Sequence, residues 1–257
     1  MPKVLNIYKP RGKTPFEVVK KLQEIIPTYK NLKIGYAGRL DPMAHGVLLI
    51  LIHPETKNRT TYQNLDKEYE FDLLLGINTD TYDLLGLITN YKHVIYSDDL
   101  LKNIRKCSSK LVGSYRQVYP VYSSKTIKGK PLYKWARENL LDTIDIPTKV
   151  VNIHSLKIVK IREITQVKLL QNVTKRIKMV DGDFRQDKIL KTWNTFLTTH
   201  SNDKFVLVKY RVKCQSGTYV RSICQTLGEM LGCGAVAYEI KRTKVGEFYI
   251  KDALKVF

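Results

Sequence analysis

Several features that mark whole classes of protein are missing from this 257-residue chain. No stretch approaches the roughly 20 apolar residues that a membrane-spanning helix needs, and the longest apolar run, 47–52, has the length of a strand. The four cysteines show no CxxC spacing, which argues against a structural zinc ion or a disulfide framework and favours a reducing compartment. The amino terminus lacks both an apolar signal region and Arg/Ser-rich transit character. We therefore expect a cytoplasmic protein with no membrane segment.

Acidic residues are also scarce. The chain has 24 of them against 44 lysines and arginines, which gives a net charge of +20 and a pI near 9.7. Such a charge suits a phosphate-rich partner, so RNA or DNA is the leading partner class. The alternative is an AT-rich genome that enriches lysine, asparagine, isoleucine and tyrosine and leaves many lysines merely solvated. We favour the nucleic-acid interpretation.

The apolar periodicity predicts strands and helices in a mixture without a βαβ rhythm, which favours an α+β fold. The expected strands, of which the last would close the sheet, cover 4–8, 47–52, 67–77, 150–161, 204–214 and 235–248. In the third strand, period-two alternation would place on one face Tyr69, Phe71, Leu73 and Leu75.

Helices are expected from Pro15 onward and over 98–110, 131–139 and 218–231. Thr14 and Glu17 have the spacing of a capping box for the first helix. Its apolar face would consist of Phe16, Val19, Leu22 and Ile26. The fourth helix would turn inward Val220, Ile223, Leu227, Met230 and Leu231.

The segment 164–203 differs from the rest because it is polar, charged and only weakly periodic. We interpret the chain as one domain, 1–257, that carries a lineage-specific insertion at 164–203. A small helical excursion or a mobile basic loop is expected there rather than a separate domain.

The run GYAGRLDPMAHG, residues 35–46, places Asp41 in a turn framed by glycines. Glycine permits unusual backbone angles, and a residue before proline is driven towards extended geometry, so 33–46 is expected to be a structured loop. A single carboxylate in such a turn of a very basic protein is a plausible nucleophile.

This run resembles the catalytic motif of the TruB family of tRNA pseudouridine synthases, which presents an aspartate in a Leu-Asp-Pro turn. Companion segments with the family's pattern occur in order. They are NIYKPRGKTP at 6–15, KEYEF with Tyr69, the thumb-like segment 116–139, VKCQSGTYVRSI with Arg221, and IKRTKVGEF with Ile240 and Arg242. The resemblance covers roughly residues 3–163 and 204–250.

The resemblance implies a pseudouridine synthase fold, a mixed and mainly antiparallel sheet flanked by helices, and isomerisation of a uridine in the tRNA T-loop at position 55. Asp41 would be the nucleophile, Arg221 its counter-ion and Tyr69 the aromatic partner of the displaced base. An arginine within about 4–6 Å favours the charged form of a carboxylate. The reaction is redox-neutral and adds no atoms, so neither a cofactor nor a metal is expected.

The resemblance also implies that the target uridine is flipped out of its stack, which costs a few kcal/mol that pocket contacts must offset. The residues expected to contact RNA are Lys9, Tyr36, Gly38, Lys125, Lys130, Arg137, Ile240 and Arg242. For Ile240, contact with the base and ordinary core packing stay open. Stacking and core packing are equally open for Tyr115, Tyr119, Tyr122 and Tyr133.

Two departures from the family pattern affect the expected RNA contacts. Tyr36 stands where the family usually has histidine, and no carboxy-terminal PUA-type RNA-binding domain is expected here. The insertion would supply some of the missing affinity through Lys168, Lys175, Arg176, Lys178, Arg185, Lys188 and Lys191, or it is surface decoration.

We expect a monomer that acts on the tRNA T-stem-loop without an obligate protein partner. The alternatives are the same chemistry on another stem-loop, such as ribosomal or organellar RNA, and an RNA-folding chaperone with secondary catalysis.

Overall fold

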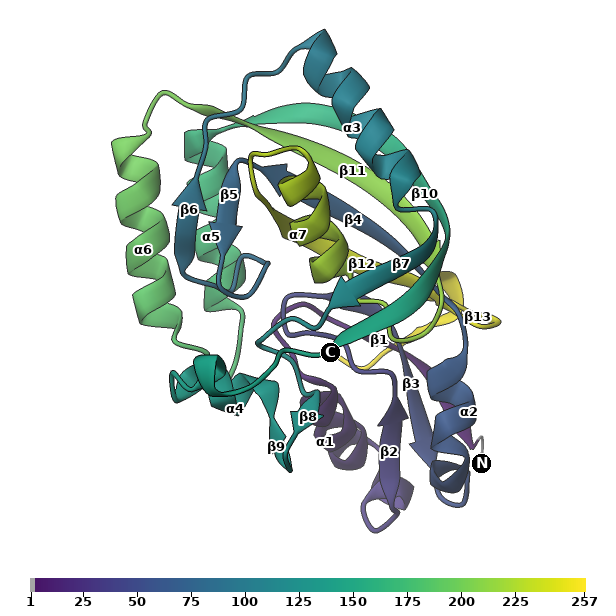
Figure 1. Ribbon diagram of the computed structural model, residues 1–257. Coiled ribbons are helices and arrows are strands. Elements are labelled where there is room, and N and C mark those ends of the chain that lie inside the picture. Colours follow the sequence, from purple (N-terminus) through teal and green to yellow (C-terminus); the bar gives the residue numbers. More distant parts are fainter. Residues whose placement is uncertain (1–2) are drawn as a thin grey trace.

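The computed structural model describes residues 3–257, and a long mixed sheet organises them (Figure 1). Its strands are β1 (Val4–Lys9), β2 (Ile34–Ala37), β3 (His45–Ile52), β4 (Lys67–Leu75), β7 (Gly113–Val118), β10 (Thr148–Thr165), β11 (Lys204–Cys214), β12 (Ala235–Val245), β13 (Phe248–Tyr249) and β14 (Leu254–Lys255). Two small hairpins stand apart, β5 (Ile77–Thr79) with β6 (Ile88–Tyr91), and β8 (Thr126–Ile127) with β9 (Lys130–Pro131).

The helices lie between these strands in the chain. They are α1 (Pro15–Ile25), α2 (Arg59–Asn64), α3 (Asp98–Lys110), α4 (Leu132–Arg137), α5 (Gln166–Lys178), α6 (Gln186–Thr199) and α7 (Val220–Met230). Short 3-10 turns occur at η1 (Pro27–Tyr29), η2 (Glu55–Asn58), η3 (Leu141–Thr143) and η4 (Ile250–Asp252). No helix of residues 3–257 has the length and apolar character to cross a membrane.

The strand order is β14-β1-β3-β12-β4-β11-β10-β7, with β2 beside β3 and β13 beside β12. Within the described residues, β1–β14 and β3–β12 pair in parallel and the other neighbours pair antiparallel. The expected α+β fold with a mainly antiparallel sheet is therefore confirmed. The prediction that 235–248 closes the sheet is wrong, because β12 pairs with both β3 and β4 at its centre.

Helices cover both faces of the sheet, and β4 shows why. Tyr69, Phe71 and Leu73 belong to one core cluster together with residues of α3 and α7. Leu74 points the other way, into a cluster with residues of α5 and α6. The predicted alternation is thus confirmed, and each fully buried leucine or phenylalanine contributes about 1.5–3 kcal/mol of hydrophobic stabilisation.

The first helix begins as predicted but is rotated. The Thr14 side chain accepts from the Glu17 amide and the Glu17 side chain accepts from the Thr14 amide, so the capping box is present. Val18, Val19 and Leu22 are buried, whereas Phe16 is 58% exposed. The buried residues Pro15, Val18, Val19 and Leu22 form one stripe along the helix, and its centre points in nearly the same direction as Pro15. Successive helical residues turn by about 100°, so Phe16 points away from this stripe and is not part of the core face.

Two other local predictions are also wrong. The segment 33–46, predicted as a loop, contains the strand β2, which pairs with β3. The hydrogen bonds of β2 come from this partner strand, so the sequence of the segment itself does not reveal it. Met230 at the end of α7 is 37% exposed, whereas Val220, Ile223 and Leu227 are buried as predicted.

The predicted insertion at 164–203 is a pair of antiparallel helices, α5 and α6, which we call the helix pair. The two lie side by side at the left of Figure 1. Fully buried apolar residues recur every fourth position, which is one face of a helix: Leu169, Val173 and Ile177 in α5, and Ile189, Trp193 and Leu197 in α6. The helical excursion is therefore confirmed and the mobile loop excluded.

Candidate active site

The Asp41 loop, residues 38–44, connects β2 to β3, and one glycine at its start and another just after its end let it fit. Gly38 has φ +71° and Gly46 has φ +113°, both in the left-handed region that glycine adopts without strain. A Cβ at Gly46 would lie 2.2 Å from the carbonyl oxygen of Arg242. Any side chain at Gly46 would therefore separate the loop from β12.

Asp41 and Arg221 form a bidentate ion pair. The Arg221 Nε donates to Asp41 Oδ2 at 2.8 Å, and Nη2 donates to Oδ1 at 3.1 Å. The Asp41 side chain is 34% exposed, whereas that of Arg221 is 3% exposed. The predicted partnership is present, and it leaves the carboxylate open to a ligand while its counter-ion is inside the protein.

Arg221 has further partners besides Asp41 that hold it in place. Its Nη1 donates to the Thr81 carbonyl oxygen at 2.8 Å and its Nη2 to the Tyr122 carbonyl oxygen at 3.3 Å. Its Nε lies 3.8 Å from Oδ2 of Asp83, a buried second carboxylate. Burial alone would lower the pKa of Arg221, but Asp41 and Asp83 together raise it.

Asp83 is the site residue that sequence reasoning missed. Its Oδ1 accepts from the Thr81 hydroxyl at 2.8 Å and from the Leu85 amide at 2.9 Å. Burial raises the pKa of Asp83 to about 6, and the adjacent Arg221 opposes the shift. A Thr-x-Asp turn with this internal hydrogen bonding occurs in many loops, so only the approach of Arg221 distinguishes it.

Tyr69 belongs to the same core cluster as Leu40, the residue before Asp41, and Ile240. It pairs across the β4–β12 ladder with Arg242 and is 8% exposed. Burial raises the pKa of Tyr69, although the Arg242 cation opposes this. Ile240 is 5% exposed, so here it packs in the core.

Arg242 is not on the RNA-facing surface, contrary to expectation. It is 1% exposed and donates to the carbonyl oxygens of Val47, Arg39 and Gly38 at 2.7, 3.2 and 3.0 Å. Because two of these carbonyls belong to the Asp41 loop, Arg242 fastens that loop to β12.

Lys9 is also misplaced by the sequence prediction. It is fully buried, and its ammonium group donates to the backbone carbonyl oxygens of Pro10 and Lys13. Burial lowers the pKa of Lys9 to about 7, with Asp41 acting in the opposite direction. A side chain without exposed surface cannot contact RNA in this conformation, so the expected RNA contact is wrong.

The other expected RNA cations lie on the thumb, the segment that contains β8, β9 and α4. Lys125 is exposed, with its ammonium 5.4 Å from the centre of the Tyr119 ring. Lys130 pairs with Glu138, and Arg137 lies 3.2 Å from Asp183. Of these three expected cations, Lys125 alone has no carboxylate partner among the described residues, so its charge is available to a phosphate.

The expected stacking residues divide between surface and core. Tyr115 is buried and its hydroxyl bonds Ser222 and Thr226, so it is a core residue. Tyr133 is 36% exposed and Tyr119 is half-buried. The guanidinium of Arg185 covers the Tyr122 ring at 4.4 Å, and that of Arg59 covers the Tyr36 ring at 5.7 Å.

No group of three or more histidine, cysteine, aspartate or glutamate side chains able to hold a metal occurs among residues 3–257. The site brings together a partly exposed carboxylate, its buried guanidinium partner and a buried phenol. Such a carboxylate can act as a nucleophile, because Arg221 orients it and compensates its charge.

Comparisons with known proteins agree with this geometry. A model of the TruB family pseudouridylate synthase (N terminal domain) matches residues 27–184. The tRNA pseudouridine synthase B of Thermotoga maritima is 32% identical over 254 residues, which are 99% of this chain and 66% of that protein. The protein of the same name from Chlamydia muridarum is 31% identical over 252 residues, 98% of this chain and 83% of its own length.

A solved chain from a Cbf5-Nop10-Gar1 complex superposes with a TM-score of 0.60 at 20% identity, covering 98% of this chain and 51% of that one. The mixed sheet with its helices is thus a pseudouridine synthase fold. The chain belongs to the TruB family of pseudouridylate synthases. It spans about two thirds of the length of the Thermotoga maritima relative.

Proposed function

We propose that this protein isomerises uridine to pseudouridine in the T-loop of tRNA, at position 55, with Asp41 as the nucleophile. The observation that carries the proposal is the bidentate pair of a one-third exposed Asp41 with a buried Arg221. Relatives named tRNA pseudouridine synthase B support the choice of tRNA.

The reaction breaks the bond between the sugar and N1, rotates the base and joins the same sugar to C5. The proton on C5 is released and N1 takes up a proton, so the atoms balance. Arg221 fixes the direction of the Asp41 carboxylate before substrate arrives, so little reorganisation is needed during the reaction. Tyr69 is buried in the cluster that contains Leu40 of the Asp41 loop, and in this proposal its ring contacts the detached base and keeps water away.

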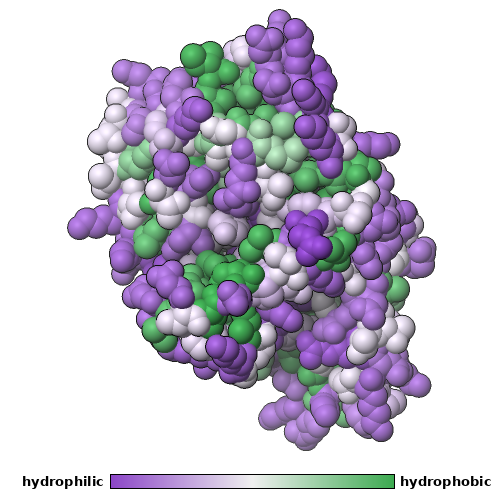
Figure 2. All heavy atoms as spheres, in the orientation of Figure 1, coloured by the Kyte–Doolittle hydropathy of each residue, from purple (hydrophilic) through white to green (hydrophobic). Residues whose placement is uncertain are grey.

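Access to the uridine requires contacts that offset unstacking. The face in Figure 2 is mostly hydrophilic, with hydrophobic areas between the hydrophilic side chains. Lys125 and the Tyr119 ring beside it offer a cation and a stacking surface on the thumb. The net charge of +20 favours encounter with a polyanion at low salt.

The decisive experiment incubates the purified protein with an unmodified tRNA transcript and maps pseudouridine at single-nucleotide resolution. Asp41→Asn should abolish conversion and leave tRNA binding largely intact, whereas Asp99→Asn, an exposed change on α3, should behave like wild type. An Asp41→Asn variant that still turns over would show that the nucleophile is another group.

The map also separates the alternatives. Modification of a different stem-loop would replace the T-loop assignment and keep the chemistry. Binding and refolding of RNA without any modification would instead indicate a chaperone. Action as a monomer in the cytoplasm belongs to the same proposal, and light scattering of the free protein tests the monomer.

A further inference from the structure

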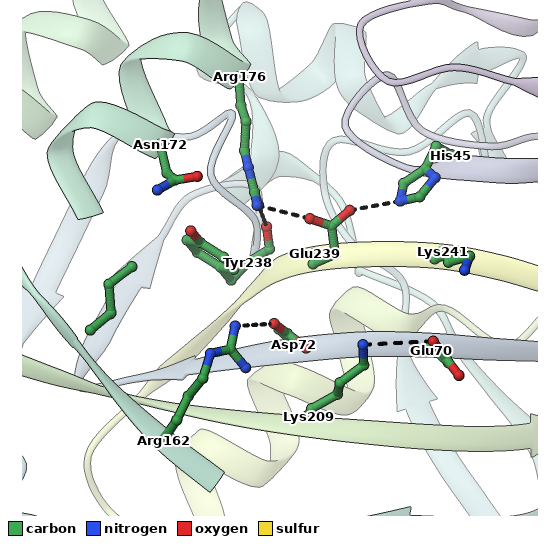
Figure 3. Close-up of a pocket in the computed structure, with 11 residues that line it drawn as sticks. His45, Glu70, Asp72, Arg162, Asn172, Arg176, Lys209, Tyr238, Glu239 and Lys241 are labelled. Carbon is green, nitrogen blue, oxygen red and sulfur yellow. Dashed lines mark hydrogen bonds and ion pairs between the residues drawn. The ribbon is translucent and has the colours of Figure 1, made fainter. Parts of the chain in front are cut away.

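On the face of the sheet opposite Tyr69, a cavity of about 450 Å³ lies between β4, β12 and α5. Figure 3 shows Glu239 of β12 linked to both His45 and Arg176. The His45 Nε2 lies 2.7 Å from Glu239 Oε1, and the Arg176 Nη2 lies 2.9 Å from Oε2. Glu239 therefore joins α5 to the first residue of β3, four positions after Asp41.

Glu239 is a fixed charge in this arrangement. Arg11 is a further ion-pair partner, and Arg176 also donates to the Tyr238 carbonyl oxygen. Burial alone would raise the pKa of Glu239, but the His45 hydrogen bond and the two arginines lower it to about 2. Charge-assisted hydrogen bonds among poorly hydrated groups are stronger and more directional than surface ion pairs. The contacts of Glu239 can therefore fix the position of His45 relative to α5.

A second connection runs through the turn after β1. The Gly12 amide donates to the Pro42 carbonyl oxygen at 2.9 Å, and the Asp181 amide donates to the Gly12 carbonyl oxygen at 3.3 Å. A Cβ at Gly12 would lie only 2.1 Å from the carbonyl oxygen of Met179. Lys13 also pairs with Asp181. The connection between α5 and α6 thus contacts the turn that holds the residue after Asp41.

We infer that the helix pair is a positioning element for the Asp41 loop, which it holds at one end through Glu239 and His45 and near its middle through Gly12 and Pro42. This inference rests on the proposed function, because it assigns the helix pair to the rate of the step at Asp41.

The charges of the helix pair distinguish this role from RNA binding. Arg176 has a side chain only 12% exposed, and Arg185 pairs with Asp80 at 2.8 Å. These two arginines are therefore occupied within the protein, contrary to the expectation that they contact RNA. The exposed cations of the helix pair are Lys168, Lys175, Lys178, Lys188 and Lys191.

Point variants test the inference better than removal of the helix pair, which would uncover the apolar face around Leu74, Leu207 and Val236. Arg176→Met keeps the apolar stem and removes the guanidinium. Arg105→Met makes the same change on the exposed surface of α3 and is the matched control. Arg176→Lys restores the charge without the forked geometry.

The readouts are the single-turnover rate at saturating enzyme and the tRNA Kd over a range of salt concentrations. Arg176→Met should slow the step about tenfold, because a small displacement of a reacting group has effects of this size. Its Kd and salt dependence should stay at wild-type values, and Arg176→Lys should recover part of the rate. A wild-type rate in Arg176→Met, or a raised Kd alone, would overturn the inference.

A double variant tests the route through Glu239. Arg176 and His45 contact different oxygens of Glu239, so the rate losses of Arg176→Met and His45→Gln should be less than additive when combined. Additive losses would exclude a shared route. Amide hydrogen exchange over 38–46 should be faster in Arg176→Met than in Arg105→Met. Unchanged exchange would count against the helix pair as a positioning element for the Asp41 loop.

Hydrogen exchange also keeps this inference separate from the proposed function. If wild-type protein modifies no RNA, the proposed function fails, whereas faster exchange of the Asp41 loop in Arg176→Met would still support the physical connection.

Discussion

Replacing Asp83 with asparagine tests whether this second carboxylate near the Arg221 guanidinium sets the reactivity of Asp41. The substitution keeps the side-chain shape, and the amide oxygen can still accept from the Thr81 hydroxyl and the Leu85 amide. It removes one negative charge 3.8 Å from the Arg221 Nε. Arg221 then has Asp41 as its remaining carboxylate partner among those it contacts in the described residues.

The size of the effect follows from that distance. Two unit charges 3.8 Å apart interact by about 4 kcal/mol at an effective dielectric constant of 20. Asp41 and two carbonyl oxygens still hold the guanidinium, so we expect about half of this energy to appear as a higher barrier. A barrier higher by about 2 kcal/mol lowers the rate about 30-fold.

The pH dependence gives a second, independent sign. The pKa of Asp83 is raised by burial from 3.8 to about 6, so its charge is present above pH 6 and lost as the pH falls through that value. The wild-type rate should therefore decrease below about pH 6, whereas Asp83→Asn should be slow at every pH and lack this step.

The same substitution that slows the reaction should not destabilise the fold. A carboxyl group whose folded pKa exceeds its unfolded value destabilises the fold once it is ionised, here by about 3 kcal/mol above pH 6. Asp83→Asn should thus be at least as stable as wild type at pH 7, measured by urea unfolding.

The rate of Asp83→Asn is measured as single-turnover tritium release from tRNA that carries tritium on uridine C5, with Asp99→Asn as control. A wild-type rate in Asp83→Asn would refute the reasoning.

The remaining predictions concern buried and thumb cations. Burial lowers the pKa of Lys9 to about 7, so between pH 7 and 9 the unfolded chain binds one more proton than the folded chain. The free energy of unfolding should therefore rise over this range by at most about 1.4 kcal/mol per pH unit. Urea titrations should show that Lys9→Met flattens this slope. Arg242→Met leaves three carbonyl oxygens without their donor and should cost about 4 kcal/mol, seen as a Tm about 10 °C lower; an unchanged Tm would contradict its role in fastening the loop. Lys125→Ala should raise the tRNA Kd and reduce the slope of log K against log salt by about one, while an unchanged slope would remove Lys125 from the interface.

Much of the local structure could be predicted from sequence because short-range chemistry determines it. The capping box at Thr14 and Glu17, the alternation in β4 and the strand 204–214 are all observed. Each depends on residues within one element, where hydrogen bonding and periodicity act directly. The rotation of α1, the strand β2 and the central place of β12 were not predictable in this way, because distant segments decide them.

The site shows the same division. The motif around Asp41 and the pattern around Arg221 identified two partners that lie 180 positions apart in sequence. Asp83 escaped notice because its turn is common and its partner comes from α7. Lys9 and Arg242 looked like surface cations because nothing in their own segments indicates that pairing with other strands would bury them.

By itself, the sequence determined the residue types of the site and the order of most elements, since motif spacing and periodicity are properties of neighbouring residues. Tertiary structure alone decided which charges are buried, which carboxylate supports Arg221, and that the helix pair reaches the Asp41 loop through Glu239 and Gly12. The physical reason is that desolvation and ion pairing depend on distances between atoms, and folding sets those distances between residues far apart in the chain.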